Sequence, residues 1–485
     1  MMEYVIQEAR TNMIIQVLMT ILAALLVSVL PSIELVLHAL LYFKGLKNKS
    51  ETSHNKLLRK PLVSILIPVK NEPEELFERS LKSIANLNWP KDKIEVIIIS
   101  DDPPRKASVL RDRIEKISRE VGLHTIFINR IKPRGGRSGA LNDGLRIANG
   151  KYVMTLDVDN IIDQELFEEA ISLLENKNYS AVVARWKPLN TDTRVSQAQA
   201  YALDYLMDAL YRGFQGLNLP VFPLGSGTIY RRDVLLRMGG WDEERIQDDM
   251  EIGSRLIGKG YTTGFVDKYG VYVELPPTVK ALKVQQSRWS YGAMDALITR
   301  FLYLIKAPVP LYARFLYIAF LLQYTPVVGF MLGLSILFVA AYFMLINNLI
   351  FIVLASLSTV LAILYIYSFI SSHVMRGRKL KDTIVMLGRS SALVTLLAPW
   401  ITFYTLKALF RIPYKYRITP KGKEAFKRSS SQTDYSKIVV VLVLILSLTA
   451  YLVLLMRNHY VFVNMPYLLL AIAVMYSLLR WWKEI

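Results

Sequence analysis

The stretch YVMTLDVDN, residues Tyr152–Asn160, joins a short apolar run to two aspartates and decides the fold class. Its apolar half reads as a buried β-strand, and Asp157 and Asp159 stand where that strand runs out. Because side chains alternate along an extended chain, we expect both carboxylates on one side. There they could share a Mg²⁺ or Mn²⁺ with substrate phosphates, since Mg²⁺ prefers a few carboxylates plus phosphate oxygens. The alternative is a loop start capped by aspartates, and a D-x-D pattern alone favours neither interpretation.

Segments on both sides of this stretch repeat the strand pattern. LVSILIPV (62–69), IEVIIIS (94–100) and HTIFIN (124–129) each read as a buried strand, and polar segments such as Glu74–Asn86 read as amphipathic helices between them. This alternation predicts a mostly parallel α/β sheet between Pro61 and about Arg300. Ligands of such sheets bind at the carboxyl ends of the strands, so residues that end the strands are the first candidates for a site.

The composition is that of a membrane protein. Hydrophobic residues make up 53% of the 485 residues and the mean hydropathy is +0.30, which is too apolar for an ordinary soluble enzyme. The net charge of +19 comes from Lys and Arg that cluster beside apolar segments, which fits anionic membrane lipids and argues against nucleic acid as a partner. The chain has no Cys, and its five His show no paired spacing, so any bound metal must be held by oxygen.

Apolar segments place the α/β region between membrane helices. Residues 1–11 form a short N-terminal tail, and 12–44 form one transmembrane helix that is tilted or kinked at Pro31. The Lys and Arg that follow place residues 45–292 in the cytoplasm, and an interfacial helix follows at 293–312. Residues 313–373 then hold two transmembrane helices, Phe315–Leu345 and Leu349–Ile370.

The apolar segment within 374–412 has basic clusters at both ends. A single crossing would put one cluster outside, so we favour an interfacial or re-entrant segment over a true span. Residues 413–437 form a basic cytoplasmic loop, and 438–482 form a last pair of transmembrane helices. The sequence therefore predicts a multi-pass protein of the cell membrane with about five spans.

Two further acidic pairs stand at element boundaries. IIISDDPP carries Asp101 and Asp102 at the end of a predicted strand, and IQDDMEIG carries Asp248 and Asp249. The last pair also suits a helix N-terminus, where acidic side chains meet the helix dipole favourably. Three such pairs in one α/β region nevertheless indicate a site for a charged ligand, because strand ends are where such ligands bind.

Two glycine-containing stretches lie between these pairs. RGGRSGALNDGL contains Arg137 and makes a basic turn into a helix, which suits contacts with phosphate or sugar. GSGTIYRR contains Gly225 and Ser226, small residues that permit a ligand to approach the backbone closely.

Seven motifs follow one another in order and carry a family resemblance: SILIPVKNE, IISDD, GGRSGALN, LDVDN, GSGTIYRRDVL, GGWDEERIQDD and QQSRW. Together, between Pro61 and Gly292, they closely resemble the membrane-integrated family 2 glycosyltransferases, the cellulose, hyaluronan and related polysaccharide synthases. YRITPK, residues 416–421, is similar to the F-x-V-T-x-K gating loop of the processive synthases. The resemblance implies a GT-A-like α/β domain fused to a polytopic α-helical transmembrane region, and makes 413–437 the gating loop.

The resemblance also implies roles for individual residues. Those that match nucleotide-sugar-binding positions are Asp101, Asp102, Arg137, Asp157, Gln285, Arg288, Thr419 and Lys421. Asp157 and Asp159 would meet the metal and the diphosphate, and Asp249 matches the catalytic aspartate. Those expected to contact the acceptor are Trp289, Asp248, Gly225 and Ser226. Asp248 stands where the family usually has Glu, and Arg137 where Lys is common, so the identity of the sugar stays open.

The motif QQSRW, which contains Gln285, Arg288 and Trp289, has residue types suited to its implied role. A guanidinium pairs with phosphate through two hydrogen bonds, and an indole offers a broad apolar face to a sugar. Arg288 and Gln285 would help to neutralise the leaving UDP, while Trp289 would stack on the terminal acceptor sugar. The alternative, an interfacial tryptophan anchor, explains Trp289 but not the other two.

The expected function is that of an inverting, metal-dependent glycosyltransferase with Mg²⁺ or Mn²⁺ as cofactor. Its partners would be a UDP-sugar donor, a growing glycan or a lipid acceptor, and membrane lipids, but no nucleic acid. It would extend a β-linked polysaccharide and translocate it across the membrane. The alternatives are a non-processive enzyme that makes a glycolipid and a transporter without catalysis, which would leave the acidic strand ends unexplained.

Overall fold

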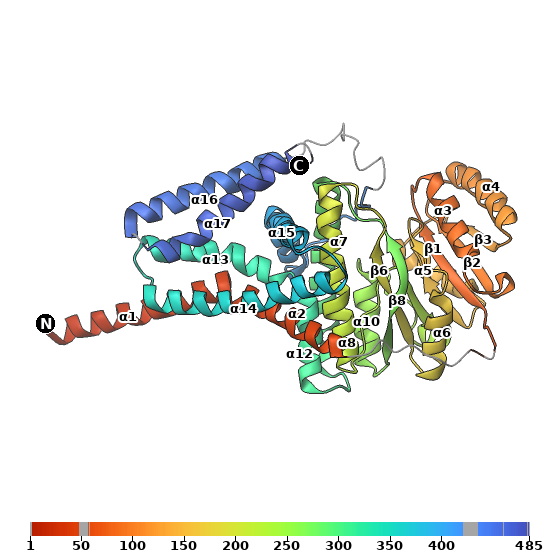
Figure 1. Cartoon of the computed structure of the whole chain (residues 1–485), viewed down its shortest axis with the longest axis horizontal. Helices are drawn as coiled ribbons and strands as arrows, with labels where there is room; N and C mark the ends of the chain where they lie inside the picture. Colours follow the sequence, from red (N-terminus) through yellow and green to blue (C-terminus); the bar gives the residue numbers. More distant parts are fainter. Residues whose placement is uncertain are drawn as a thin grey trace.

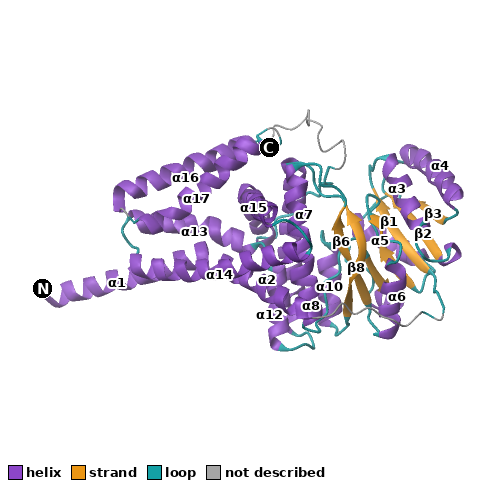
Figure 2. Ribbon diagram, viewed as in Figure 1, coloured by secondary structure: helices purple, strands orange, loops and turns teal. Residues whose placement is uncertain are grey.

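The computed structural model describes residues 2–47, 57, 59–420, 435–458, 460–482 and 484. Figure 1 shows a sheet with its covering helices at one end of the molecule and a set of long helices at the other, from which the N-terminal helix projects. In Figure 2 the described strands all lie in the first of these two regions. The predicted combination of an α/β region with a helical region is therefore present.

The sheet has eight strands in the order β3-β2-β1-β4-β7-β6-β8-β5. Its first half, all parallel, consists of β3 (His124–Asn129), β2 (Ile94–Ser100), β1 (Val63–Val69) and β4 (Tyr152–Thr155). The second half consists of β7 (Thr228–Arg231), β6 (Ala181–Pro188), β8 (Thr263–Val273) and β5 (Ile161–Ile162). There β7 runs antiparallel to β4 and β6, and β5 antiparallel to β8, while β6 and β8 are parallel.

The prediction of a mostly parallel sheet is thus correct for the first half and wrong for the second, which makes the whole sheet mixed. After β6 the chain forms α7 (Arg194–Leu206) and α8 (Arg212–Gly216), with a π-helical turn between them. The helix α7 packs against α15 (Leu380–Leu409), and α8 packs against α2 (Leu30–Lys47). The chain then returns to the sheet at the same end of the strands at which β6 left it. Because no crossover carries the chain to the opposite end first, β7 runs antiparallel to β6.

Helices cover both faces of the sheet: α3 (Glu74–Ala85), α4 (Pro104–Val121), α5 (Gly136–Ile147), α6 (Leu166–Asn176), α9 (Arg232–Arg237) and α10 (Asp248–Gly258). Alternate residues of β1 enter different apolar layers. Val63, Ile65 and Ile67 pack with α3, α4 and α6, whereas Leu66 packs with α5, α9 and α10. Because both faces of the sheet are buried, its strands read as continuous apolar runs in the sequence.

One helix runs from Met2 to Lys47 and includes the predicted span 12–44. It consists of α1 (Met2–Ala24), a π-helical turn (Leu25–Val29) and α2 (Leu30–Lys47). The wider turn directly precedes Pro31, because proline has no N–H to donate and its ring crowds the carbonyl group one turn earlier. The irregularity predicted at Pro31 takes this form in the structure.

The end of α2 lies very close to α8. A Cβ atom added to Gly45 would lie 3.0 Å from the carbonyl carbon of Arg212, and one added to Gly216 would lie 2.6 Å from the carbonyl oxygen of Lys44. The two helices therefore touch backbone to backbone, which a larger side chain at either glycine would prevent. This contact fixes the N-terminal helix to the α/β region.

Among the described residues, six helices have the length and composition of membrane spans: Ile6–Lys47, α13 (Thr325–Tyr342), α14 (Asn348–Met375), α15 (Leu380–Leu409), α16 (Ser436–Asn458) and α17 (Val461–Trp481). This is one more than predicted, because the sequence assigned residues 374–412 to the interface. These helices make the molecule a candidate membrane protein by length and composition.

Two predicted boundaries differ from the structure. The predicted span Phe315–Leu345 is broken at Leu322–Tyr324 into α12 (Leu311–Leu321) and α13. Pro326 stands in the first turn of α13, a position that proline favours, and it disfavours a helical residue before it. The helix α11 (Val279–Ile305) is continuous, so the predicted boundary at residue 292 falls inside it.

The helix α15 differs from the other long helices in direction. In Figure 1 it is seen nearly end-on, whereas α13, α14, α16 and α17 run across the view. It packs against α7 and α11, which border the α/β region, and also against α13, α14 and α17. This direction supports the interfacial interpretation of residues 374–412, which stays a prediction.

Candidate active site

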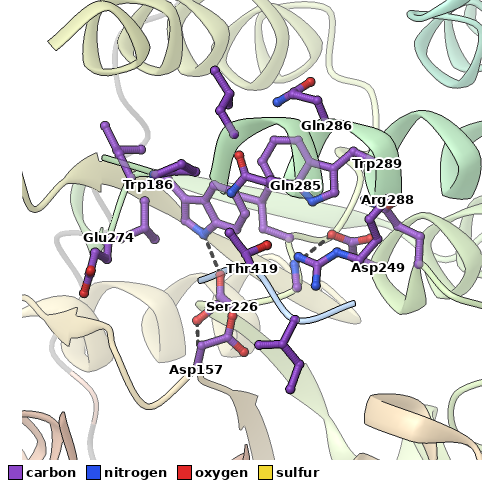
Figure 3. Close-up of a pocket in the computed structure, with 18 of the residues that line it drawn as sticks. Asp157, Trp186, Ser226, Asp249, Glu274, Gln285, Gln286, Arg288, Trp289 and Thr419 are labelled. Atoms are coloured by element: carbon purple, nitrogen blue, oxygen red, sulfur yellow. Dashed lines mark hydrogen bonds between the residues drawn. The ribbon is translucent and has the colours of Figure 1, made fainter. Parts of the chain in front are cut away.

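A cavity of about 650 Å³ joins the carboxyl edge of the parallel strands to α12, the turn after it and α15. At one end it is lined by residues such as Val69 at the end of β1, and at the other by Leu393 and Leu397 of α15. The predicted site residues that line it are Asp101, Arg137, Asp157, Asp159, Gly225, Ser226, Asp248, Asp249, Gln285, Arg288, Trp289 and Thr419. Figure 3 shows a close-up of this cavity. Lys421 lies outside the described residues.

Asp157 and Asp159 both line the cavity, but they lie in a turn, because β4 ends at Thr155. The expected strand alternation beyond Thr155 is therefore wrong. The Asp157 side chain is 40% exposed and accepts a hydrogen bond from Arg137 at 3.0 Å, while its backbone N–H donates to Ser226 Oγ at 3.0 Å. Asp159 is buried, and its backbone carbonyl accepts a hydrogen bond from Arg79 at 2.7 Å.

The donor set of this turn fits a divalent cation that is shared with a ligand. No group of three or more His, Cys, Asp or Glu that could hold a metal occurs within the described part of the chain. Two carboxylates leave most positions around Mg²⁺ or Mn²⁺ to other oxygens, such as those of a diphosphate. Asp157 and Asp159 therefore fit an ion whose binding depends on the substrate.

Arg137 lies at the start of α5 and connects three segments of the cavity wall. Its guanidinium donates to the carboxylates of Asp157 and Asp248 and to the carbonyl oxygen of Gly225. These contacts draw together the end of β4, the start of α10 and the loop before β7. Its predicted contact with the nucleotide-sugar is thus accompanied by a role in shaping the site.

Asp249 lies in the first turn of α10, where backbone N–H groups hold its carboxylate. Oδ2 accepts a hydrogen bond from Gly225 N at 3.0 Å, and Oδ1 accepts one from Met250 N at 2.8 Å. Burial, followed by the neighbouring charge of Asp248, raises the pKa of Asp249 to about 7. A carboxylate with this pKa can exchange a proton near neutral pH, which is what a general base requires.

The two residues of the first acidic pair, Asp101 and Asp102, lie in different surroundings. Asp101 lines the cavity, and both its oxygens accept hydrogen bonds from Arg130, at 2.6 and 2.7 Å. Asp102 does not line the cavity; its buried carboxylate accepts hydrogen bonds from Asn71 N at 2.8 Å and Ser100 Oγ at 3.0 Å. Of the two candidates for the nucleoside, only Asp101 is therefore placed to meet a ligand.

The motif QQSRW lies on α11, where Gln285, Arg288 and Trp289 face the cavity (Figure 3). Arg288 Nη1 donates a hydrogen bond to the hydroxyl of Tyr416 at 2.9 Å, and its guanidinium lies 5.5 Å from the centre of that ring. The segment around Tyr416 is thereby held against α11. A predicted motif of the α/β region and the predicted gating loop meet at this contact.

Two tryptophans lie side by side in the cavity wall. The rings of Trp289 on α11 and Trp186 on β6 have centroids 6.4 Å apart and are tilted by 33°. Trp186 Nε1 donates a hydrogen bond to the carbonyl oxygen of Ser226 at 2.7 Å, which fixes its indole (Figure 3). Paired indoles present a broad apolar surface that suits a sugar ring.

Thr419 lies deep in the cavity although the residues before it are exposed. Its side chain is only 7% exposed, and its hydroxyl has no hydrogen-bond partner among the described residues. A buried hydroxyl without a partner costs free energy unless a ligand supplies one. Thr419 therefore fits a position that meets a polar group of the substrate.

Sequence reasoning missed three residues of this region: Arg130, Trp186 and Gln286. Arg130 directly follows β3, so a basic residue at the edge next to Asp101 was the available signal. Trp186 follows Arg185 in the second half of β6, where an aromatic residue was a weaker signal. Gln286 accepts a hydrogen bond from the hydroxyl of Tyr324 at 3.2 Å, and nothing in the sequence indicates that contact.

Two family models match this chain, and several known proteins are similar to it. The family model of glycosyl transferase family group 2 matches residues 152–482, and that of glycosyl transferase family 2 matches residues 64–239. A probable glycosyltransferase of Sulfolobus acidocaldarius is 30% identical over 468 residues, which cover 95% of this chain and 98% of that protein. Glucomannan 4-beta-mannosyltransferase 1 of Cyamopsis tetragonoloba is 29% identical over 317 residues, which cover 60% of this chain and 58% of the plant protein.

A solved structure shares the fold. It is the mannosyltransferase PcManGT from Pyrobaculum calidifontis in complex with GDP-Man and Mn²⁺, with a TM-score of 0.56 and 16% identity. The match covers 81% of this chain and 100% of that chain. The mixed sheet described above is therefore a GT-A-like sheet.

Proposed function

Because this chain belongs to glycosyltransferase family 2, we propose that it inverts the anomeric centre of a nucleotide-sugar with Asp249 as general base. The observation that carries this proposal is the Asp249 carboxylate, which is held by two backbone N–H groups inside the cavity. Asp249 accepts the proton of an acceptor hydroxyl as that oxygen bonds to the anomeric carbon. The bond from this carbon to the diphosphate breaks, and one displacement turns an α-linked donor into a β-linked product.

Asp157 and Asp159 would hold a Mg²⁺ or Mn²⁺ ion together with oxygens of the diphosphate. Such an ion supplies positive charge that stabilises the departing nucleoside diphosphate. Arg288 and Gln285 line the same cavity and add a guanidinium and an amide for this group. The presence of Mn²⁺ and GDP-Man in PcManGT supports an ion of this class here.

Asp101 is proposed to bind the base of the donor nucleotide. Arg130 holds its carboxylate through two hydrogen bonds, which orients it before the donor binds. A carboxylate accepts an N–H of uracil or of guanine equally well, so Asp101 fits either nucleotide. A UDP-sugar is the first candidate donor because the sequence motifs resemble those of the polysaccharide synthases. GDP-mannose is the second, because several similar proteins are named mannosyltransferases.

The acceptor is proposed to be a growing β-linked glycan that meets Trp289 and Trp186. The cavity continues beyond these indoles to α12, the turn after it and α15, which supports extension of a polysaccharide followed by its translocation. A glycolipid product is the alternative. We place the enzyme in the cell membrane with its GT-A-like domain in the cytoplasm, because basic residues follow the N-terminal helix.

A donor screen tests this function. The purified full-length protein is incubated with Mg²⁺ or Mn²⁺ and with UDP-Glc, UDP-GlcNAc, UDP-GlcA, UDP-Gal or GDP-Man, and released nucleotide is measured. We expect one donor to give nucleotide release and a ladder of β-linked products. A single short product would identify the glycolipid synthase, and no release from any of these donors would contradict the proposal.

The variant Asp249→Asn tests the general base. It should bind nucleotide as the wild type does but transfer sugar roughly 10²–10⁴ times more slowly, which is the usual contribution of a general base. Asp233→Asn on the exposed side of α9 is the matched control and should keep full activity. Transfer by Asp249→Asn at the wild-type rate would remove this residue from the mechanism.

A further inference from the structure

A second cavity, of about 500 Å³, lies where the sheet meets the turn between α14 and α15. It shares no lining residue with the first cavity. The cationic side chains that line it are Arg185, Lys187, Lys268, Arg376 and Arg378, and the carboxylates are Asp204 and Asp267. A concave surface with more cations than carboxylates attracts an anionic ligand.

The ion pairs around this cavity leave positive charge unbalanced. Asp208 is buried, and the guanidinium groups of Arg185, Arg212 and Arg376 share two carboxylates, those of Asp208 and Asp267. Two carboxylates cannot neutralise three cations. Lys268 is exposed and forms no ion pair within the described part of the chain. The cavity therefore offers an ammonium group and partly balanced guanidinium groups to a ligand.

The position of the cavity places it at the edge of the membrane. Arg376 and Arg378 follow directly after Met375, the last residue of the candidate span α14. An exposed tyrosine, Tyr367, lies about two turns earlier on the same helix. Exposed tyrosines are enriched where hydrocarbon meets head groups.

An exposed apolar surface lies on the same helix. Tyr367 is 61% exposed and Met375 is 68% exposed, and both belong to the last turns of α14. A soluble anion would need only the cationic cavity, whereas a lipid would also use an apolar surface for its chain. Charge and apolar surface together therefore favour a lipid over a free phosphate.

We propose that this second cavity binds the phosphate-bearing head group of an anionic membrane lipid, whose hydrocarbon chain lies along the exposed side of α14. The site borders the strand that forms the acceptor wall. Arg185 and Lys187 of β6 line this cavity, and Trp186 between them lines the first. Because side chains alternate along a strand, the lipid and the acceptor glycan contact opposite faces of β6.

The experiment compares two lipids with the same acyl chains. Dioleoyl phosphatidylglycerol and dioleoyl phosphatidylcholine are titrated into the purified full-length protein in detergent, and binding is followed by native mass spectrometry and by the shift of Tm. We expect wild type to bind the anionic lipid at least five times more tightly than the zwitterionic one. The preference should weaken as salt rises, because the attraction is electrostatic.

Variants locate the site. Lys268→Gln breaks no ion pair among the described residues and should reduce the preference, and Lys268→Gln with Arg378→Gln should abolish it. The matched control carries Lys116→Gln and Arg119→Gln on α4, which lies on the far side of the sheet from the long helices (Figure 1), and should bind as wild type does. Size-exclusion and circular dichroism profiles confirm that each variant is folded. If the double variant does not fold, the Lys268→Gln variant alone tests the proposal.

Three outcomes would overturn the proposal. The first is equal binding of the two lipids by the wild type. The second is a folded Lys268→Gln variant that keeps the full wild-type preference. The third is stabilisation of the wild type by inorganic phosphate to the same extent as by phosphatidylglycerol, which would make the site one for a soluble anion.

Discussion

Replacing Asp248 by Asn should move the acidic side of the pH–activity profile to lower pH. The general base must be deprotonated, so activity is high above the pKa of Asp249 and falls as the pH drops through it. Burial contributes most to the raised pKa of Asp249, about 7, and the charge of Asp248 contributes next. Removing that charge lowers the pKa of Asp249. Arg137, which loses one carboxylate partner in this variant, also lowers the pKa of Asp249 through its positive charge.

The size of this effect follows from simple electrostatics. At an effective dielectric constant of about 20, two like charges roughly 6 Å apart repel by about 3 kcal/mol, or about 2 pKa units. Arg137 lies against Asp248 and offsets part of this repulsion in the wild type. We therefore expect the midpoint of the acidic limb to fall by roughly one pH unit, while burial keeps it above the ordinary value of Asp.

The assay is nucleotide release at limiting donor between pH 5 and pH 9, roughly the range in which a free-enzyme base with this pKa titrates, at constant ionic strength. Asp248→Glu is the matched control, since it keeps the negative charge and should leave the midpoint in place. A midpoint that does not move in Asp248→Asn, or that moves to higher pH, would refute the electrostatic coupling. So would an equal shift in both variants.

Four further outcomes are expected. Asp157→Asn should lower transfer by roughly 10²-fold or more and remove the response to Mg²⁺ or Mn²⁺, and full wild-type activity in EDTA would contradict a metal site. Arg130→Ala should raise KM for the donor about tenfold with kcat little changed, because Arg130 orients Asp101 and the turn before α5. Arg130→Lys should recover part of the loss. Trp186→Ala should shorten the product and Trp186→Phe should restore its length; unchanged product length in Trp186→Ala would exclude a contact with the acceptor. Thr419→Ala should lower polymer synthesis. Nucleotide with metal should protect residues 411–420 of the wild type from proteolysis, and a cleavage rate that does not change with nucleotide would indicate that this segment is only a linker.

The parts of the fold that could be predicted are those written in local patterns. Both faces of β1, β2 and β4 are buried, so these strands appear as apolar runs, and their carboxyl ends locate acidic residues of the cavity. The edge strand β3 is only partly buried, although its sequence predicts a buried strand. The direction of β7 has no such pattern, because it depends on helices that pack outside the sheet. The break between α12 and α13 had a local signal in Pro326, which the long apolar run concealed.

The site shows the same division. Asp101 and Asp102 are indistinguishable in sequence, and only the fold turns one toward the cavity and the other toward Ser100. The bonds of Arg130 to Asp101 and of Arg288 to Tyr416 join residues far apart in the chain, so no local spacing reveals them. Residue types at strand ends could thus be predicted, whereas their partners could not.

The backbone contact between α2 and α8 limits how this enzyme can move during a catalytic cycle. At Gly45 and Gly216 the backbones of the two helices touch directly, so the helices have little room to slide past each other. We therefore expect the GT-A-like domain and the N-terminal helix to move together. Motion that admits donor or advances product is then expected in short segments such as residues 411–420. The signal of a probe attached to α2 should not change during turnover, whereas the signal of a probe attached to residues 411–420 should change at each step.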